Sequence, residues 1–232
     1  MLTLSAATEI AGSLAFPSKM PSTSYDIPAG ACKAGSKLAK VEGTACSICY
    51  AMKDKYTWPN PRKAQEKRLS GIGHPQWVEA MVAILTNAHK GPIRVDLGKV
   101  APNTERYRFN EPGWHRWHSA GDIQSVGHLA KICEIARQTP KIKHWLPTTE
   151  LGMVRRYVTD GGSIPSNLVI RVSSIMVDDW RRRAWPNTSA VIALREPSEG
   201  AHACPAKTQG NECKSCRACW QPNVGHVEYH IH

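Results

Sequence analysis

Seven of the eight cysteines fall into two groups whose spacing favours metal binding. Four of them lie within 16 residues near the C-terminus, in the pattern C-x8-C-x2-C-x2-C: Cys204, Cys213, Cys216 and Cys219. Four thiolates complete one tetrahedral zinc site or one cubane iron–sulfur cluster. A run with two short spacers is more typical of a 4Fe–4S cluster, because each thiolate must reach a different iron. We therefore expect a cluster and keep zinc as the alternative metal.

The second group lies near the N-terminus and offers three thiolates. Cys32, Cys46 and Cys49 form the pattern C-x13-C-x2-C, and the nearest histidine downstream, His74, is 25 residues beyond Cys49. Three protein ligands leave one metal position open, as catalytic sites do. We expect a 4Fe–4S cluster with one free iron here. The alternatives are that a C-terminal cysteine completes a single closed cluster, or that some of the thiols are inert.

The remaining cysteine, Cys133, is expected to be structural. Its spacing from Leu129 and Ala136 places it on the apolar face of a predicted helix, where a lone cysteine is usually a small buried hydrophobe. Disulfides are disfavoured, because the N-terminus lacks the pattern of a secretory signal and the chain is long enough to bury a core.

Composition limits the class of protein. The 232 residues, 41% hydrophobic and 21% charged, fit one large domain or two small ones and exclude collagen-like and disordered chains. No apolar run approaches the about 20 residues of a membrane-spanning helix, so we expect no membrane partner. The formal charge of +11 is compatible with a nucleic-acid partner and equally with an ordinary solvated surface.

Strand and helix patterns alternate along the chain. Helices are predicted over residues 61–69, 75–87, 123–137, 150–158 and 177–184, and strands over 93–97, 106–109, 115–119, 142–146, 168–173 and 189–194. Such alternation predicts a mainly parallel sheet with right-handed crossovers. We therefore predict an α/β fold, either a partial (β/α) barrel or an open mainly parallel sheet with cysteine-rich loops at both ends. Residues 1–30 are predicted to be an irregular N-terminal segment, 31–200 the α/β domain with the N-terminal cysteine loop, and 201–232 a C-terminal cysteine-rich cluster-binding segment.

Polar side chains gather where the predicted strands end. In parallel α/β folds the ligand sites lie at the carboxyl ends of the strands, so we expect these residues to share a cleft with the N-terminal cysteines and to bind a cofactor. Each group also has the composition of a helix N-cap, with Asp122 placed to cap the helix predicted over 123–137. The candidates are Ser119, Gly121, Asp122, Thr148, Glu150, Arg171 and Ser173.

Four stretches together resemble the phage "gene product 88" family: CSICYA at 46–51, RWHSAGD at 116–122, HWLPTTE at 144–150 and CKSCRACW at 213–220. That family occurs in tailed phages and prophages and has no settled activity. The resemblance covers most of the chain from about residue 25 onward. It implies a phage protein located in the cytoplasm of a bacterial host.

The layout is also similar to that of radical S-adenosylmethionine enzymes. Those enzymes place three cluster cysteines in a loop after the first barrel strand, and after the second a turn that holds the methionine end of the cofactor. Ser119–Asp122 stands in the position of that turn. The spacing departs from the usual C-x3-C-x2-C, because Cys32 lies ten residues farther away. The resemblance implies S-adenosylmethionine as a cofactor and an auxiliary cluster on the C-terminal cysteines.

Three functions are therefore in competition, and the substrate and oligomeric state stay open. The first is an iron–sulfur enzyme with an open-iron cluster, of the radical S-adenosylmethionine type. The second is a basic, metal-stabilised nucleic-acid-binding protein, and the third is an iron–sulfur protein with a structural or redox role. In the second, phosphates and bases would be contacted by Arg62-Lys63, Lys67-Arg68, Arg155-Arg156, Arg181–Arg183 and by Trp58, Trp114 or Trp117.

Overall fold

The computed structural model describes residues 2–96 and 107–231. Its centre is a seven-stranded sheet in the order β1-β4-β5-β6-β7-β9-β8, in which every pair of neighbours is parallel. The sheet is open, which confirms the prediction of an α/β fold with an open mainly parallel sheet. Its strands are β1 Thr23–Tyr25, β4 Trp114–Trp117, β5 Lys143–Thr148, β6 Leu168–Ser173, β7 Thr188–Ile192, β8 His202–Ala203 and β9 His226–His230.

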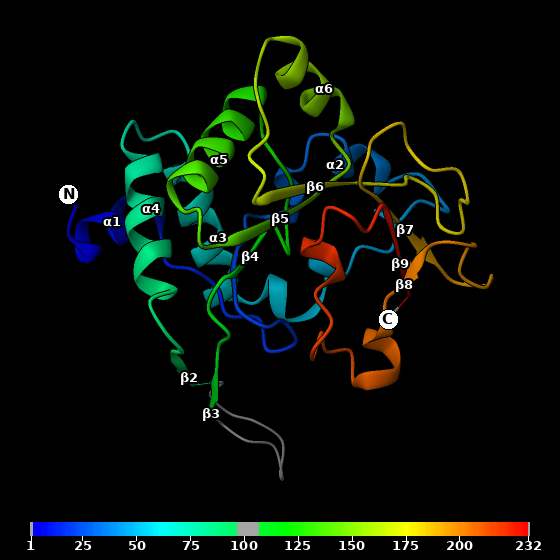
Figure 1. The fold of residues 1–232 in the computed structure, drawn as a ribbon, viewed down its shortest axis with the longest axis horizontal. Helices are drawn as coiled ribbons and strands as arrows, with labels where there is room; N and C mark the ends of the chain where they lie inside the picture. Colours follow the sequence, from blue (N-terminus) through cyan, green and yellow to red (C-terminus); the bar gives the residue numbers. More distant parts are fainter. Residues whose placement is uncertain (1, 97–106, 232) are drawn as a thin grey trace.

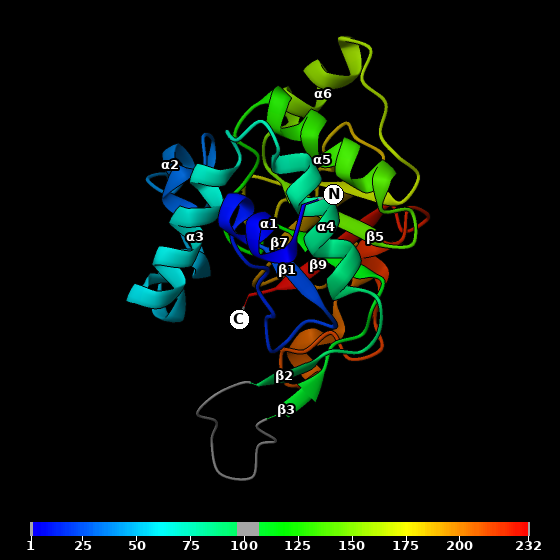
Figure 2. The ribbon, with the colours of Figure 1, turned by 90° about the vertical axis from the view of Figure 1, so that its left-hand side faces the viewer.

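The order of the strands explains where the helices lie. From β1 to β9 the sheet follows the order of the chain, so right-handed crossovers all place their helices on the same face. Figures 1 and 2 show α4, α5 and α6 together on that face. The helices are α1 Leu4–Ala11, α2 Gly35–Leu38, α3 Pro59–Gly71, α4 Trp77–Ala88, α5 Val126–Gln138 and α6 Leu151–Thr159. Among the described residues, none of them is long and apolar enough to cross a membrane.

The main core lies between this helical layer and the sheet. Four apolar side chains on one face of α4 are buried: Trp77, Met81, Ile84 and Leu85. Trp117 of β4 and Leu146 of β5 are buried with them. Cys133 is buried in the same core, as the helix pattern predicted. The opposite face of the sheet carries a second core, in which Trp145 of β5 packs with Trp220 of the C-terminal segment. This segment includes the short 3-10 helices η4 Pro205–Gln209 and η5 Ala218–Trp220, and it takes the place of helices on that face (Figure 1).

Some predicted elements differ from the structure. Residues 177–184 form no helix, because Val177 N donates to Gly43 O and the Asp178 carboxylate binds the backbone of Ala193. Residues 1–30 are not irregular, since they contain α1 and β1. Strand β9 was not predicted at all. The predicted cap of α5 is also wrong, because Ser125, not Asp122, accepts the hydrogen bond from the first turn of the helix.

The predicted strand over 93–97 is present but does not join the main sheet. It forms β2 Arg94–Asp96, which pairs antiparallel with β3 Tyr107–Phe109. Residues 97 and 106, the outer ends of these two predicted strands, lie outside the described residues. The β2–β3 pair projects away from the sheet (Figures 1 and 2).

Candidate metal centres

The N-terminal cysteine loop lies at the carboxyl edge of the sheet. The loop follows β1, and two later strands hold it in place. Ala34 N donates to Glu150 Oε1, just after β5, at 2.5 Å. Ala45 N donates to Ile175 O, just after β6, at 2.9 Å. Figure 2 shows α2 of this loop beside α3, on the side of the molecule where the C-terminus lies.

The thiols of this loop share a small space that glycine leaves open. A Cβ atom at Gly35 would lie 3.6 Å from the Sγ atoms of both Cys32 and Cys46. The two sulfur atoms are therefore no farther apart than the sum of these distances. Burial raises the pKa of Cys32 to about 12 and that of Cys46 to about 11, and Cys49 and the Asp122 carboxylate add to both rises. Glu150 acts in the same direction on both thiols.

Asp122, which follows β4, forms hydrogen bonds with the residues at the end of β5. Its Oδ1 accepts from Thr148 Oγ1 at 2.6 Å, and its Oδ2 accepts from Thr149 N at 2.9 Å. Burial raises the pKa of Asp122 to about 6, although these hydrogen bonds favour the ionised form. Asp122, Thr148 and Glu150 thus lie at the same edge as the cysteine loop, but the hydrogen-bonding capacity of Asp122 and Thr148 is already used to join strand ends.

Ser119 and Gly121 occupy the turn that follows β4. Gly121 has φ 87°, and a Cβ atom there would lie 2.3 Å from Ile27 Cγ1, so only glycine fits against the segment after β1. The backbone of Ser119 is fixed because its N donates to Asp26 Oδ1 and its O accepts from Tyr50. Its Oγ is buried, and a side-chain hydrogen bond between Ser119 and Tyr56 lowers the pKa of Tyr56, which burial raises.

The contacts of two further candidates are with other parts of the chain. Ser173 Oγ is 3.2 Å from Ser189 Oγ on the neighbouring strand. Arg171 is fully buried and donates to four backbone carbonyls, of which three belong to the C-terminal segment. Those three acceptors, at 3.0–3.5 Å, are Val224, Ala218 and Gln221. Arg171 thus supports the C-terminal cysteine segment, and a role of either residue toward a cofactor stays a prediction.

The four C-terminal cysteines lie on the helix-free face of the sheet. Cys204 N donates to Glu228 O at 2.8 Å, and Cys213 N donates to Lys19 O at 2.9 Å. Burial raises the pKa of Cys219 to about 12, and the neighbouring thiols Cys204 and Cys213 add to that rise. The thiols of this group are therefore close enough to influence one another's ionisation.

Three further side chains contact these thiols or act on them electrostatically, and none of the three was among the predicted ligands. His202 Nε2 lies 3.4 Å from Cys216 Sγ, and Tyr229 Oη lies 3.3 Å from Cys219 Sγ. The position of His202 two residues before Cys204 is the one signal that was available. Arg116 is the third: it stacks over Trp145 at 4.4 Å and donates to Tyr50 Oη at 3.2 Å.

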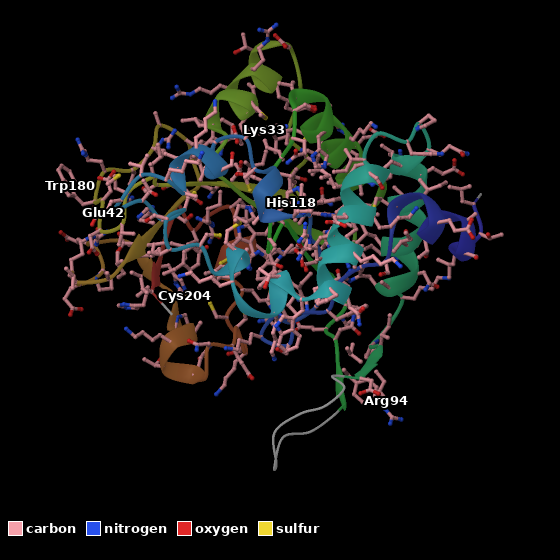
Figure 3. The ribbon with its side chains drawn as sticks, turned by 180° about the vertical axis from the view of Figure 1, so that it is seen from behind. Lys33, Glu42, Arg94, His118, Trp180 and Cys204 are labelled. Carbon is pink, nitrogen blue, oxygen red and sulfur yellow. The ribbon has the colours of Figure 1, made fainter. Side chains whose placement is uncertain are left out.

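Arg116 contacts the N-terminal cysteine loop and acts electrostatically on one C-terminal thiol. It donates to Tyr50, the residue after Cys49, and its positive charge lowers the pKa of Cys213, which burial raises. Figure 3 shows this side of the molecule, with Cys204 and Lys33 in parts of the ribbon that are far apart in the sequence.

All eight cysteines are free thiols. As the described side chains stand, no set of three or more His, Cys, Asp or Glu residues is arranged around a single metal ion.

A family model described as gene product 88 matches residues 2–222. The chain belongs to the gene product 88 family. This confirms the phage family that the four stretches resemble. No curated protein and no solved structure matches the chain.

Proposed function

We propose that this gene product 88 protein is an iron–sulfur enzyme. In this proposal Cys32, Cys46 and Cys49 hold a 4Fe–4S cluster with one open iron. A second, closed cluster is held by Cys204, Cys213, Cys216 and Cys219. Seven free thiols in two groups provide the donor set.

The observation that carries the proposal is a pair of arginines without a carboxylate partner. Arg171 is fully buried, and its donors reach only backbone carbonyls. Arg116 contacts an aromatic ring, a phenol and a thioether. Neither forms an ion pair among the described residues. A buried cation without a counter-charge is costly, and cluster thiolates would supply that negative charge beside Cys213 and Cys219.

The N-terminal group has the features of an open site. Three thiols are present, Gly35 adds no side chain beside two of them, and the Ser119 hydroxyl is buried at the same edge of the sheet. Glu150 holds the loop through Ala34 N. An open iron would supply one-electron chemistry and a binding position for a small cofactor. The resemblance to radical S-adenosylmethionine enzymes favours S-adenosylmethionine as that cofactor, with Ser119 as its protein contact.

The test is anaerobic purification followed by iron, sulfide and zinc analysis. Two clusters require about eight irons per chain, and one cluster requires about four. Cys46→Ser and Cys216→Ser should each lower the iron content by about four, since each removes a ligand of a different cluster. Cys133→Ala is the matched control, because Cys133 is buried in the main core away from both groups. The spectrum of the reduced protein should change when S-adenosylmethionine is added.

Several results would overturn the proposal. Zinc in place of iron would make both groups structural. An iron content of four, with no spectral response to S-adenosylmethionine, would leave one closed cluster and remove the open site. Equal iron in Cys46→Ser and Cys133→Ala would exclude Cys46 as a ligand.

A further inference from the structure

Residues 28–63, here named the cysteine-loop face, concentrate positive charge. This segment has seven basic and two acidic residues, so it carries +5 of the formal +11 in 36 of 232 residues. All seven basic side chains are exposed. They are Lys33, Lys37, Lys40, Lys53, Lys55, Arg62 and Lys63.

The same segment concentrates exposed apolar side chains. Twelve large hydrophobic side chains are exposed in the described part of the chain, and five of them belong to this face. Clustered exposed apolar groups mark interaction sites, whereas scattered ones do not. The five are Val41, Ile48, Tyr50, Met52 and Trp58, and the Trp58 side chain is 56% exposed.

The face includes the three N-terminal cysteines and the residues that follow them. Tyr50 follows Cys49, its hydroxyl donates to Ser119 O at 2.6 Å, and its ring lies 5.5 Å from that of Tyr56. The ring of Tyr50 is therefore held in one orientation before any ligand arrives. Figure 3 shows Trp180, which is 72% exposed, close to Glu42 of this face. The backbone bond from Val177 N to Gly43 O supports that proximity.

We propose that the cysteine-loop face binds single-stranded nucleic acid. Flat rings that protrude among lysines match a polyanion whose base faces are free, and each stacked base adds affinity without regard to sequence. A duplex keeps its base faces inside the stack, so Trp58 would find no partner there. Binding does not require a cluster. That the strand is the substrate of the Cys32–Cys46–Cys49 centre does rest on the proposed function.

Some of the residues that the sequence predicted as nucleic-acid contacts are buried. Arg68 is buried and donates to Ser13 O and Asp26 O, so it is not available to phosphates. Trp117 is fully buried in the main core. Trp58 is therefore the main stacking candidate, and Tyr50 is the second exposed aromatic residue of this face.

The experiment measures fluorescence anisotropy of a labelled oligothymidylate of about 20 nucleotides as the full-length protein is added. Trp58→Ala should weaken binding about 5- to 140-fold, which corresponds to about 1–3 kcal/mol for one stacked base. Phe109→Ala is the matched control, because Phe109 is 67% exposed but lies on β3, away from this face. This variant should bind like the wild type.

Salt dependence tests the lysines. Replacing Lys53, Lys55 and Lys63 by glutamine should lower the slope of log affinity against log salt by about 2, at about 0.7 per phosphate contact. The control replaces Lys90 and Lys141, which are exposed elsewhere, and should leave the slope unchanged.

Equal effects of Trp58→Ala and Phe109→Ala would overturn the inference. So would equal affinity for a duplex of the same length, or binding to phosphatidylserine vesicles without binding to the oligonucleotide. Iron is counted on the same preparation. Full oligonucleotide affinity without iron would reject the proposed function and leave this inference standing, whereas full iron without affinity would reject this inference alone.

Discussion

Replacing Arg171 by methionine tests whether its guanidinium holds the C-terminal cysteine segment on the sheet. The side chain is fully buried on β6. It makes two hydrogen bonds of 3.0 Å, to Thr188 O and Val224 O, and two longer ones, of 3.3 and 3.5 Å, to Ala218 O and Gln221 O. Methionine fills a similar length without charge or donors.

The expected loss follows from these contacts. A hydrogen bond from a charged donor contributes about 1.5–3 kcal/mol, so the two short bonds give about 3–6 kcal/mol. Three of the acceptors keep another donor: Ala218 O binds Gln221 N, Gln221 O binds Val224 N, and Val224 O binds Asn187 Nδ2. Removing a buried charge also recovers part of its desolvation cost. We therefore expect a net loss of about 2–4 kcal/mol, or about 4–16 °C in Tm for a chain of this size.

The assay combines thermal unfolding with iron analysis of the same sample. Arg155→Met is the control, because Arg155 is exposed and makes one bond of 3.3 Å to Ala184 O, so its change should stay within about 0.5 kcal/mol. Arg171→Lys keeps the charge but loses the fork of donors. It should retain more iron than Arg171→Met if the positive charge balances a cluster. The reasoning is refuted if Arg171→Met unfolds with the wild-type Tm and keeps its full iron content.

Three further changes have signs that the structure determines. Gly121→Ala should lower the free energy of unfolding by about 2–4 kcal/mol, because the added Cβ would overlap Ile27. Gly152→Ala in helix α6 should raise it by about 0.5–1 kcal/mol, because the added Cβ meets nothing within 4 Å. Equal effects of the two substitutions would contradict this packing difference. Glu150→Ala should speed hydrogen exchange of the cysteine loop about tenfold or more, because the bond from Ala34 N is lost; unchanged exchange would mean that this bond does not hold the loop. Unfolding in urea should become easier as the pH falls below 6.5, because burial lowers the pKa of six histidines in the folded state and the unfolded chain then binds more protons. The opposite effect of Asp122, whose pKa is raised to about 6, is one group against six, so stability that stays level from pH 7 to pH 5 would contradict their burial as neutral rings. These histidines are His89, His115, His118, His128, His144 and His226.

The sequence predicted the elements whose side chains repeat clearly. Residues 168–173 were predicted as a strand, and β6 has those bounds because its apolar run is long and bounded by turns. β1 has three residues, too few to show an alternation. β9 was missed for another reason: Glu228 is fully buried in it, paired with Arg195 at 2.7 Å. A pattern of polar residues gives no sign of a strand when partners elsewhere in the chain satisfy them.

The sequence predicted the candidate site only in part. The rule that parallel strands gather their ends at one edge brought Asp122 and Glu150 to the cysteine loop. Their role toward a cofactor stays a prediction. The roles of Arg116 and Arg171 could not be predicted, because they depend on which face of the sheet the C-terminal segment covers. That choice follows from the packing of Trp145 against Trp220, at 5.0 Å between ring centroids.

The position of the C-terminal segment limits how the N-terminal cysteines are reached. Helices cover one face of the sheet, and the segment held by Arg171 and Trp220 covers the other. Trp220 Nε1 donates to His115 O at 2.8 Å, so the cover is attached to β4 itself. In the proposed function, a ligand of Cys32, Cys46 and Cys49 would therefore approach from the carboxyl edge, where Tyr50 and the exposed lysines also lie. The surface that would select a substrate and the site that would act on it are thus parts of one loop, and a change in that loop affects both.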